Sequence, residues 1–168
     1  MHTSLGSMIF ELYPDCAPNT VANFLRYVAS QRFDGSDFFR IVTEDHEQAG
    51  DPVKIEAIQG GLNIDHPDLL NGIEHESTSA SGLHHQRGSL SMARYEVGSA
   101  NGSFFICFRD EPALDFAGAR QADGQGFAVF GQLIEGFSVL DAMYKRAEAR
   151  EYLQSPIAIE QVKSLDRP

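Results

Sequence analysis

Short apolar segments separated by turns are the sequence feature that most constrains the fold of this chain. Five of them lie at 38–42, 54–59, 88–93, 104–108 and 127–133, and stretches rich in Gly, Ser, Asp and Pro separate them. Their aromatic and aliphatic residues favour extended backbone, and each segment is short enough to be one strand. The pattern therefore predicts a sheet of many short strands.

Both ends of the chain add a further strand to this expectation. Met8, Phe10 and Leu12 alternate with their neighbours, as expected for a strand with one well-buried face, and Ile157 and Ile159 indicate a closing strand. Many short strands favour an antiparallel sheet, but the pattern alone leaves open whether this sheet is a barrel or a sandwich.

Two segments have a helical period instead. Val21, Phe24, Leu25 and Val28 form the apolar stripe of a first amphipathic helix, and a second helix is expected near 137–146. The chain has 168 residues, of which 42% are apolar, and this suffices for one packed core. Since no repeat or linker interrupts the sequence, we expect a single, mainly β domain over residues 1–168.

Charge and hydropathy limit the partners that the chain can have. The 24 acidic and 13 basic residues give a net charge of −11, which opposes binding to nucleic acid. No apolar run reaches the roughly 20 residues needed to cross a bilayer, so no membrane insertion is expected. The first residues lack the pattern of a secretion signal, which favours the cytoplasm; a removed leader would instead imply a periplasmic or secreted protein.

Four motifs together indicate a family. Arg40 lies in the strand segment FFRIV at 38–42, and IQGG at 58–61, LSMA at 90–93 and FFI at 104–106 follow in that order. These motifs resemble the cyclophilin family of peptidyl-prolyl cis-trans isomerases, over about residues 3–159. The resemblance implies a closed eight-stranded antiparallel barrel capped by two α-helices, acting on Xaa-Pro bonds to assist protein folding.

The reaction needs little chemistry, since rotation about an Xaa-Pro bond crosses a resonance barrier of roughly 18–20 kcal/mol without breaking a covalent bond. The resemblance implies that Arg40 donates to the prolyl nitrogen or the adjoining carbonyl. It also implies that Gln59 binds the substrate backbone and that Phe105 is the floor of the proline pocket. Leu114 resembles a pocket wall, and Ala93 a backbone contact.

The chain departs from the family pattern between the arginine and the glutamine. These two residues are nineteen positions apart, because an acidic, mostly polar segment is inserted at 43–54. The usual pocket phenylalanine is replaced by Glu56, and the methionine after it by Ala57. Alternate residues of a strand share a face, so we expect Ile55 and Ala57 to face the substrate with Gln59, and Ile55 to restore part of the apolar wall.

Other departures alter the polar rim of the expected pocket. Phe127 stands where the family has an active-site histidine, Ser103 replaces a glutamine and Arg94 replaces an asparagine. We expect all three to contribute to substrate binding. The chain has no Trp, and because the aromatic residue that often contacts cyclosporin is missing, weak binding of that drug is expected.

The expected partners are Xaa-Pro peptides and unfolded proteins, and a monomer without a cofactor is expected. The competing interpretation is a non-catalytic or weakly active proline-peptide binding or chaperone module. A pure binder would use the same pocket without needing the Arg40 guanidinium. The six histidines include no HExxH helix and no His-x-His pair. We therefore expect solvent-exposed loop histidines and no metal site.

Overall fold

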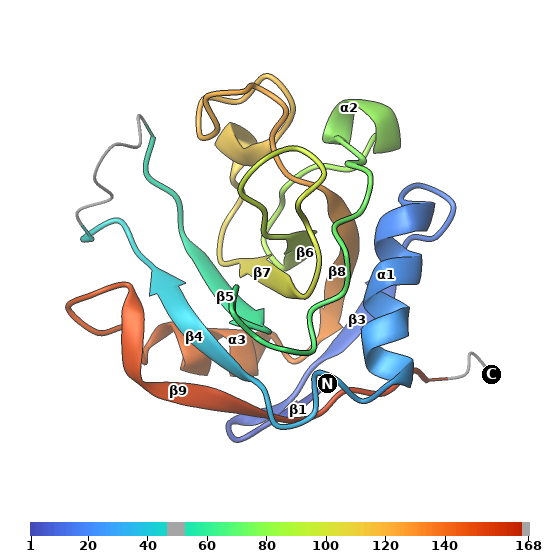
Figure 1. Ribbon diagram of the computed structural model, residues 1–168. Helices are drawn as coiled ribbons and strands as arrows, with labels where there is room; N and C mark the ends of the chain where they lie inside the picture. Colours follow the sequence, from blue (N-terminus) through green and yellow to red (C-terminus); the bar gives the residue numbers. More distant parts are fainter. Residues whose placement is uncertain (47–52, 166–168) are drawn as a thin grey trace.

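The structure, a computed structural model, describes residues 1–46 and 53–165. Within them, nine strands form one antiparallel sheet in the order β2-β1-β9-β4-β5-β7-β6-β8-β3 (Figure 1). The strands are β1 His2–Thr3, β2 Gly6–Ser7, β3 Ile9–Leu12, β4 Asp37–Val42, β5 Ala57–Gly61, β6 Ser89–Met92, β7 Ser103–Cys107, β8 Val129–Glu135 and β9 Tyr152–Gln161. Six of the seven expected strands match within a few residues, whereas β9 extends well beyond Ile157 and Ile159.

The first residues of the chain close the sheet into a barrel. Only Met8 separates β2 from β3, which stand at opposite ends of the strand order. The backbone N–H of Met8 donates to Met1 O, and the amino terminus donates to Met8 O, both at 2.9 Å. The nine strands thus form a nearly closed antiparallel barrel, as predicted, with one strand more than the eight expected because β2 and β3 are consecutive parts of one bent segment.

Both predicted helices are present, together with two short helical turns that the sequence pattern did not predict. The helical segments are α1 Pro18–Ala29, α2 Thr78–Ser81, the 3-10 turn η1 Pro112–Leu114 and α3 Phe137–Tyr144. A single turn is too short to show an apolar period, so α2 has only its caps as a signal. No helix in the described part of the chain is long and apolar enough to cross a membrane.

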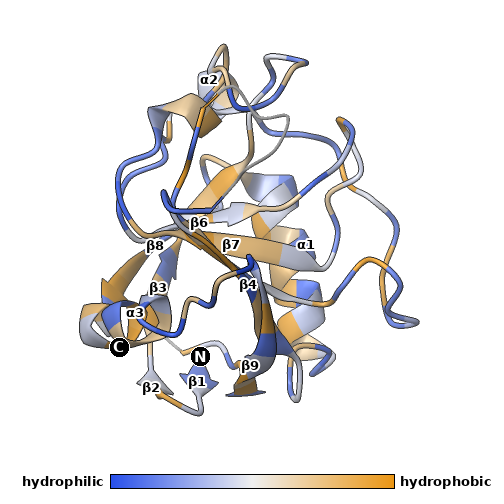
Figure 2. Cartoon of the chain, turned by 90° about the vertical axis from the view of Figure 1, so that its left-hand side faces the viewer, coloured by the Kyte–Doolittle hydropathy of each residue, from blue (hydrophilic) through white to orange (hydrophobic). Residues whose placement is uncertain are grey.

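The main core fills the barrel beneath α1. The ring of Phe24 on α1 packs 5.1–5.6 Å from the rings of Phe33, Phe104 and Phe130, and the strands around it are largely apolar (Figure 2). Edge-to-face and tilted contacts of this kind stabilise aromatic clusters beyond the area that they bury. This packing fixes the strands whose outer faces carry the site.

A second, smaller apolar cluster lies on the outside of the barrel. Strand alternation turns Phe104 into the main core and places Phe105 in this outer cluster, as predicted. The other buried members of the outer cluster are Val42, Ile55, Ala57, Cys107 and Leu114, and Ala93 and Phe127 pack against them. The outer cluster forms the base of a pocket.

Candidate active site

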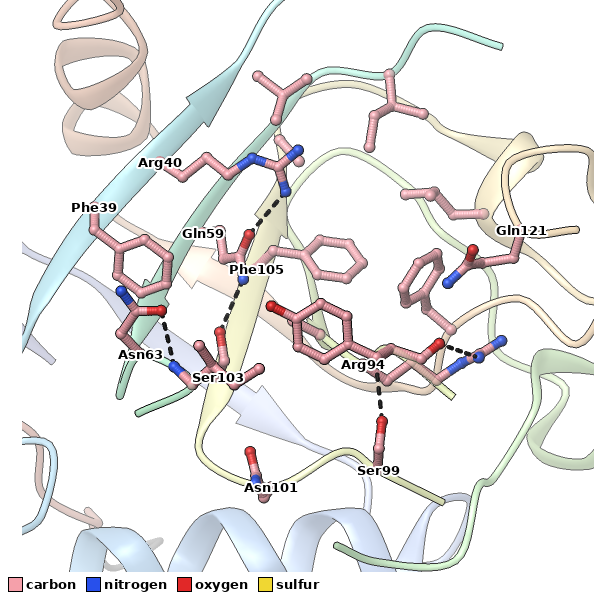
Figure 3. A pocket seen from close by; sticks show the side chains of 18 of the residues that line it. Phe39, Arg40, Gln59, Asn63, Arg94, Ser99, Asn101, Ser103, Phe105 and Gln121 are labelled. Atoms are coloured by element: carbon pink, nitrogen blue, oxygen red, sulfur yellow. Dashed lines mark hydrogen bonds between the residues drawn. The ribbon is translucent and has the colours of Figure 1, made fainter. Parts of the chain in front are cut away.

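A pocket of about 540 Å³ opens above the outer cluster (Figure 3). Strands β4, β5 and β7 provide one side, and the segments around residues 93–101 and 114–127 provide the other. All ten residues that the sequence analysis selected line this pocket: Arg40, Ile55, Ala57, Gln59, Ala93, Arg94, Ser103, Phe105, Leu114 and Phe127. The structure thus brings together residues that are up to 87 positions apart in the chain.

A β-bulge in β4 presents two consecutive side chains to the pocket. Phe38 pairs with Gly60 and Arg40 pairs with Gln59, so Phe39 is an extra residue in the ladder. Phe38 and Ile41 are fully buried in the barrel core, while Phe39 and Arg40 both line the pocket. A bulge re-aims side chains in this way because it interrupts the strict alternation of a strand.

A chain of hydrogen bonds crosses the strand side of the pocket. Arg40 Nη1 donates to Gln59 Oε1 at 3.0 Å, and Gln59 Nε2 donates to Ser103 Oγ at 3.0 Å (Figure 3). The three residues belong to the neighbouring strands β4, β5 and β7. Because Gln59 uses both ends of its amide, its orientation is fixed by the contacts on either side.

Arg40 has a second anchor in the segment before β9. Its Nε and Nη2 both donate to Glu151 Oε2, at 2.8 and 2.6 Å, and its guanidinium carbon lies 5.6 Å from the ring centre of Tyr152. Nη1 and Nη2 each retain one N–H without a partner among the described residues. Arg40 is therefore held in place and still has donors available to a ligand.

The apolar floor is well ordered by ring contacts. Phe127 meets Phe105 edge to face, with ring centroids 5.5 Å apart and planes at 89°. Leu114 and Ile55 are buried beside them, and Ala57 leaves open space because its side chain is small. The floor is therefore an apolar surface.

Ile55 and Glu56 point to different sides of the chain. Ile55 lines the pocket with Ala57 and Gln59, in agreement with the alternation that the sequence analysis used. The Glu56 carboxylate instead accepts a hydrogen bond from the hydroxyl of Tyr144 on α3 and lies 3.5 Å from Arg109 Nε. The charge at this position thus lies outside the pocket.

Arg94 lines the pocket, but the protein itself occupies its donors. The guanidinium makes five hydrogen bonds, to Asp123, to the carbonyl of Gly126 and to the carbonyl of Tyr95, at 2.6–3.2 Å. It also lies 5.3 Å from the ring centre of Phe127. Its side chain therefore supports the wall that carries Phe127, and its predicted contact with substrate stays a prediction.

A buried histidine lies behind the pocket floor. His85 Nδ1 is 2.6 Å from Asp115 Oδ1, and its Nε2 is 2.9 Å from Ser91 Oγ. Burial holds the pKa of His85 below its ordinary value against the opposing effect of Asp115. Burial alone would raise the pKa of Asp115, but the hydrogen bonds from His85 and His84 outweigh it and hold this pKa below its usual range.

The contacts of Ser91, His85 and Asp115 follow the order of a hydrolase triad, yet the arrangement cannot attack a substrate. Ser91 is 0% and His85 2% exposed, and Ser91 Oγ also lies 3.0 Å from Ala128 O. A nucleophile must reach its substrate, so this trio is a structural support.

The expectation of exposed loop histidines is wrong for two residues. His46 and His85 are buried, because each ring bonds on both nitrogens to partners distant in sequence or across a turn. Within residues 1–46 and 53–165, no three His, Cys, Asp or Glu side chains are grouped so that they could hold a metal ion.

Comparison with known proteins identifies the family. The model of the cyclophilin type peptidyl-prolyl cis-trans isomerase family matches residues 1–164. The chain belongs to the cyclophilin family. Its relatives include a Streptomyces antibioticus isomerase, 32% identical over 98% of this chain and 96% of that protein, and isomerase B of Escherichia coli, 29% identical over 96% and 92%.

The fold agrees with solved cyclophilins as well. The crystal structure of a cyclophilin-type isomerase of Cryptosporidium parvum, solved in the presence of the dipeptide Ala-Pro, superimposes with a TM-score of 0.74. It covers 98% of this chain and 96% of that one at 22% identity, which supports the fold alone. The family model and the curated relatives, rather than this structural likeness, show that this cyclophilin is a peptidyl-prolyl cis-trans isomerase, as the sequence motifs predicted.

Sequence reasoning missed three residues around the site of this cyclophilin. Asp115 follows the predicted wall residue Leu114 directly, and this adjacency was a usable signal. His85 follows His84 in the sequence, and this adjacent pair in a polar segment gives no sign that one of the two rings is buried. Glu151 had no signal, since it lies in a charged segment, 145–151, that reads as an ordinary solvated turn.

Proposed function

We propose that this cyclophilin binds Xaa-Pro segments with the proline ring on Phe105, and that Arg40 stabilises the amide while it rotates. The observation that supports this most directly is the placement of Arg40 and Phe105 on one pocket, with Gln59 between them. The guanidinium retains N–H donors on the two nitrogens that lie beyond Nε. An amide that twists loses resonance, and its nitrogen and carbonyl then need a donor.

The pocket favours the twisted state for a physical reason. Phe105, Phe127 and Leu114 exclude water from one side of the bound proline, so a hydrogen bond from Arg40 acts in a medium of low dielectric constant. A donor that is already oriented needs no reorganisation when the amide rotates. Only a contact that strengthens in the transition state accelerates the reaction, and Arg40 makes that kind of contact.

Gln59 and Ser103 complete the proposal on the strand side. Both are partly exposed in the pocket, and their hydrogen-bond chain continues the line of donors that begins at Arg40. We assign them to the peptide backbone next to the proline. Their amide and hydroxyl groups can exchange partners without moving a charge.

The test is the cis/trans exchange rate of an Ala-Pro-Phe peptide, measured by NMR with the wild type and with Arg40→Ala. Loss of a transition-state donor is expected to lower kcat by about 10²–10³. Arg26→Ala is the matched control, because Arg26 is exposed on α1, outside the pocket. This control should exchange the peptide at the wild-type rate.

The same sample tests the competing function, a proline-binding or chaperone module without catalysis. In that case, peptide signals would shift on binding, and neither the wild type nor Arg40→Ala would add exchange. Retained acceleration in Arg40→Ala would contradict the role given to the guanidinium.

We also propose that the protein acts on unfolded clients as a monomer and that cyclosporin binds it weakly. Support for weak drug binding comes from the sequence, which has no Trp and has Phe127 where the family has a histidine. Calorimetric titration with cyclosporin tests the weak binding of the drug, and light scattering tests the monomeric state. The cytoplasmic location stays a prediction.

A further inference from the structure

The segment between α3 and β9 reaches the catalytic arginine through one carboxylate. We propose that Glu151 is the positioning residue that sets the orientation of Arg40, and that His46 holds the segment that carries it. The inference rests on the proposed role of Arg40 in the isomerase reaction. Glu151 lies outside the four sequence motifs that indicated the family.

The contacts of the guanidinium support this role. Nε and Nη2 both donate to Glu151 Oε2, at 2.8 and 2.6 Å, while Nη1 donates to Gln59. All three nitrogens therefore have one fixed partner each. Hydrogen bonds between two charged groups are shorter and stronger than neutral ones, so the carboxylate is the dominant restraint on the side chain.

Glu151 is itself fixed by the strand that carries Arg40. The backbone N–H of Ile41 donates to Glu151 O at 2.8 Å. The next residue, Tyr152, pairs with Arg40 in the β4–β9 ladder. Its ring stacks on that of Phe39, with ring centroids 6.4 Å apart and planes inclined by 9°. The carboxylate is therefore presented from a backbone position that cannot drift away from the guanidinium.

His46 secures the same segment from the other side. The backbone N–H of Thr43 donates to His46 Nδ1 at 3.1 Å, so Nε2 carries the proton and donates to Glu148 O at 2.8 Å. His46 is 6% exposed, although it lies in the inserted polar segment 43–54. Residues 47–52 of that insertion lie outside the described residues. The described part thus links the insertion to the loop of Glu151.

Two effects of Glu151 on the reaction oppose each other. The carboxylate reduces the positive field that the guanidinium exerts on the amide, but it also removes rotamer freedom that the arginine would lose on reaching the transition state. The pair is partly exposed, with 25% of the Arg40 side chain and 20% of the Glu151 side chain accessible. Solvent weakens the first effect at such a site, so orientation dominates.

The experiment compares Glu151→Gln and Glu151→Ala with the wild type by NMR exchange of the same peptide. We expect Glu151→Ala to lower kcat about tenfold with KM unchanged within about twofold. Glu151→Gln retains an acceptor without the charge, and should lose about threefold. In the Arg40→Ala background, removal of Glu151 should have no further effect, because there is no guanidinium left to orient.

The Arg40 Nε–H signal gives a second readout that does not depend on turnover. It should be protected from solvent exchange in the wild type and lose protection in Glu151→Ala. Asp141→Ala is the matched control: Asp141 binds Arg87 at 2.6 Å, outside the pocket, and its loss should leave kinetics unchanged.

The possible failures are distinguishable. An unchanged kcat in Glu151→Ala, or an equal further loss in the Arg40→Ala background, would overturn the role of Glu151 while leaving that of Arg40 intact. A wild type that adds no exchange would overturn the proposed function, and this inference with it.

Discussion

The rings of Phe105 and His85 lie nearly parallel, with centroids 5.9 Å apart and planes inclined by 8°. Phe105 lies in the floor of the pocket, and His85 is buried behind it. Asp115, which follows the pocket-wall residue Leu114, holds the imidazole of His85 through a hydrogen bond. One buried polar group therefore supports both the floor and the wall of the site.

The stability of the protein is expected to depend on pH through His85. Burial keeps the pKa of the folded ring below the ordinary value of 6.5. As the pH falls below 6.5, the unfolded ring takes up a proton that the folded ring resists, so the free energy of unfolding decreases. His85→Gln should remove this component, as measured by urea unfolding between pH 5 and 8.

His66→Gln is the control for that measurement, because His66 is an exposed histidine. Its pH profile should match that of the wild type. If His85→Gln and the wild type differed by the same free energy at every pH, the titration of His85 would not contribute.

The ion pair behind the Phe127 wall should weaken in acid. Hydrogen bonds from Arg94, with a smaller contribution from the Gln125 N–H, lower the pKa of Asp123 to about 2 from 3.8. Stability from this pair is therefore complete above pH 3.8 and is lost as the pH falls toward 2. Asp123→Asn should unfold at lower urea concentration than the wild type at pH 7, and the two should converge toward pH 2.

The control for the Asp123→Asn unfolding experiment is an aspartate outside the Arg94 ion pair. Asp65→Asn changes an exposed position in the loop after β5 and should leave the midpoint unchanged. A difference between Asp123→Asn and the wild type that persists at pH 2 would show that shape, rather than charge, holds the wall.

Ile55 is expected to matter more for binding than its charged neighbour Glu56. Ile55 is 8% exposed and belongs to the pocket floor, whereas the Glu56 carboxylate faces Tyr144 and Arg109. Loss of part of the apolar contact in Ile55→Ser, about 1 kcal/mol, should raise the Kd of a proline peptide about fivefold. Glu56→Gln should leave the Kd within about twofold, as measured by NMR titration.

Glu56→Gln serves as the control because it changes the adjacent residue without altering the pocket lining. Equal weakening by both substitutions would mean that the altered strand, rather than the Ile55 side chain, limits binding. Melting curves of both variants identify that case.

The barrel and most of the pocket could be predicted because they depend on local pattern and family motifs. Alternation placed Phe104 inside and Phe105 outside, and it put Ile55, Ala57 and Gln59 on one face. Short strands were located well, although β5 begins at Ala57 instead of residue 54. The first strands, β1 and β2, have two residues each, which is too few to show an alternation.

The bulge in β4 could not be predicted from the sequence pattern. Strict alternation would send Phe39 and Arg40 to opposite faces, yet both line the pocket because the ladder skips one residue. A bulge depends on how the two neighbouring strands pair, and the residues of one strand do not encode it.

Which segments become strands, and which side of each strand carries the apolar residues, follows from the amino-acid order, since period and turn chemistry are properties of near neighbours. Which charged and polar groups meet depends instead on how the barrel folds. Arg40 and Glu151 are 111 residues apart in the chain. His85 and Asp115 are 30 residues apart. Such pairs form because barrel closure brings distant segments together, and burial then selects the few partners that satisfy each polar atom.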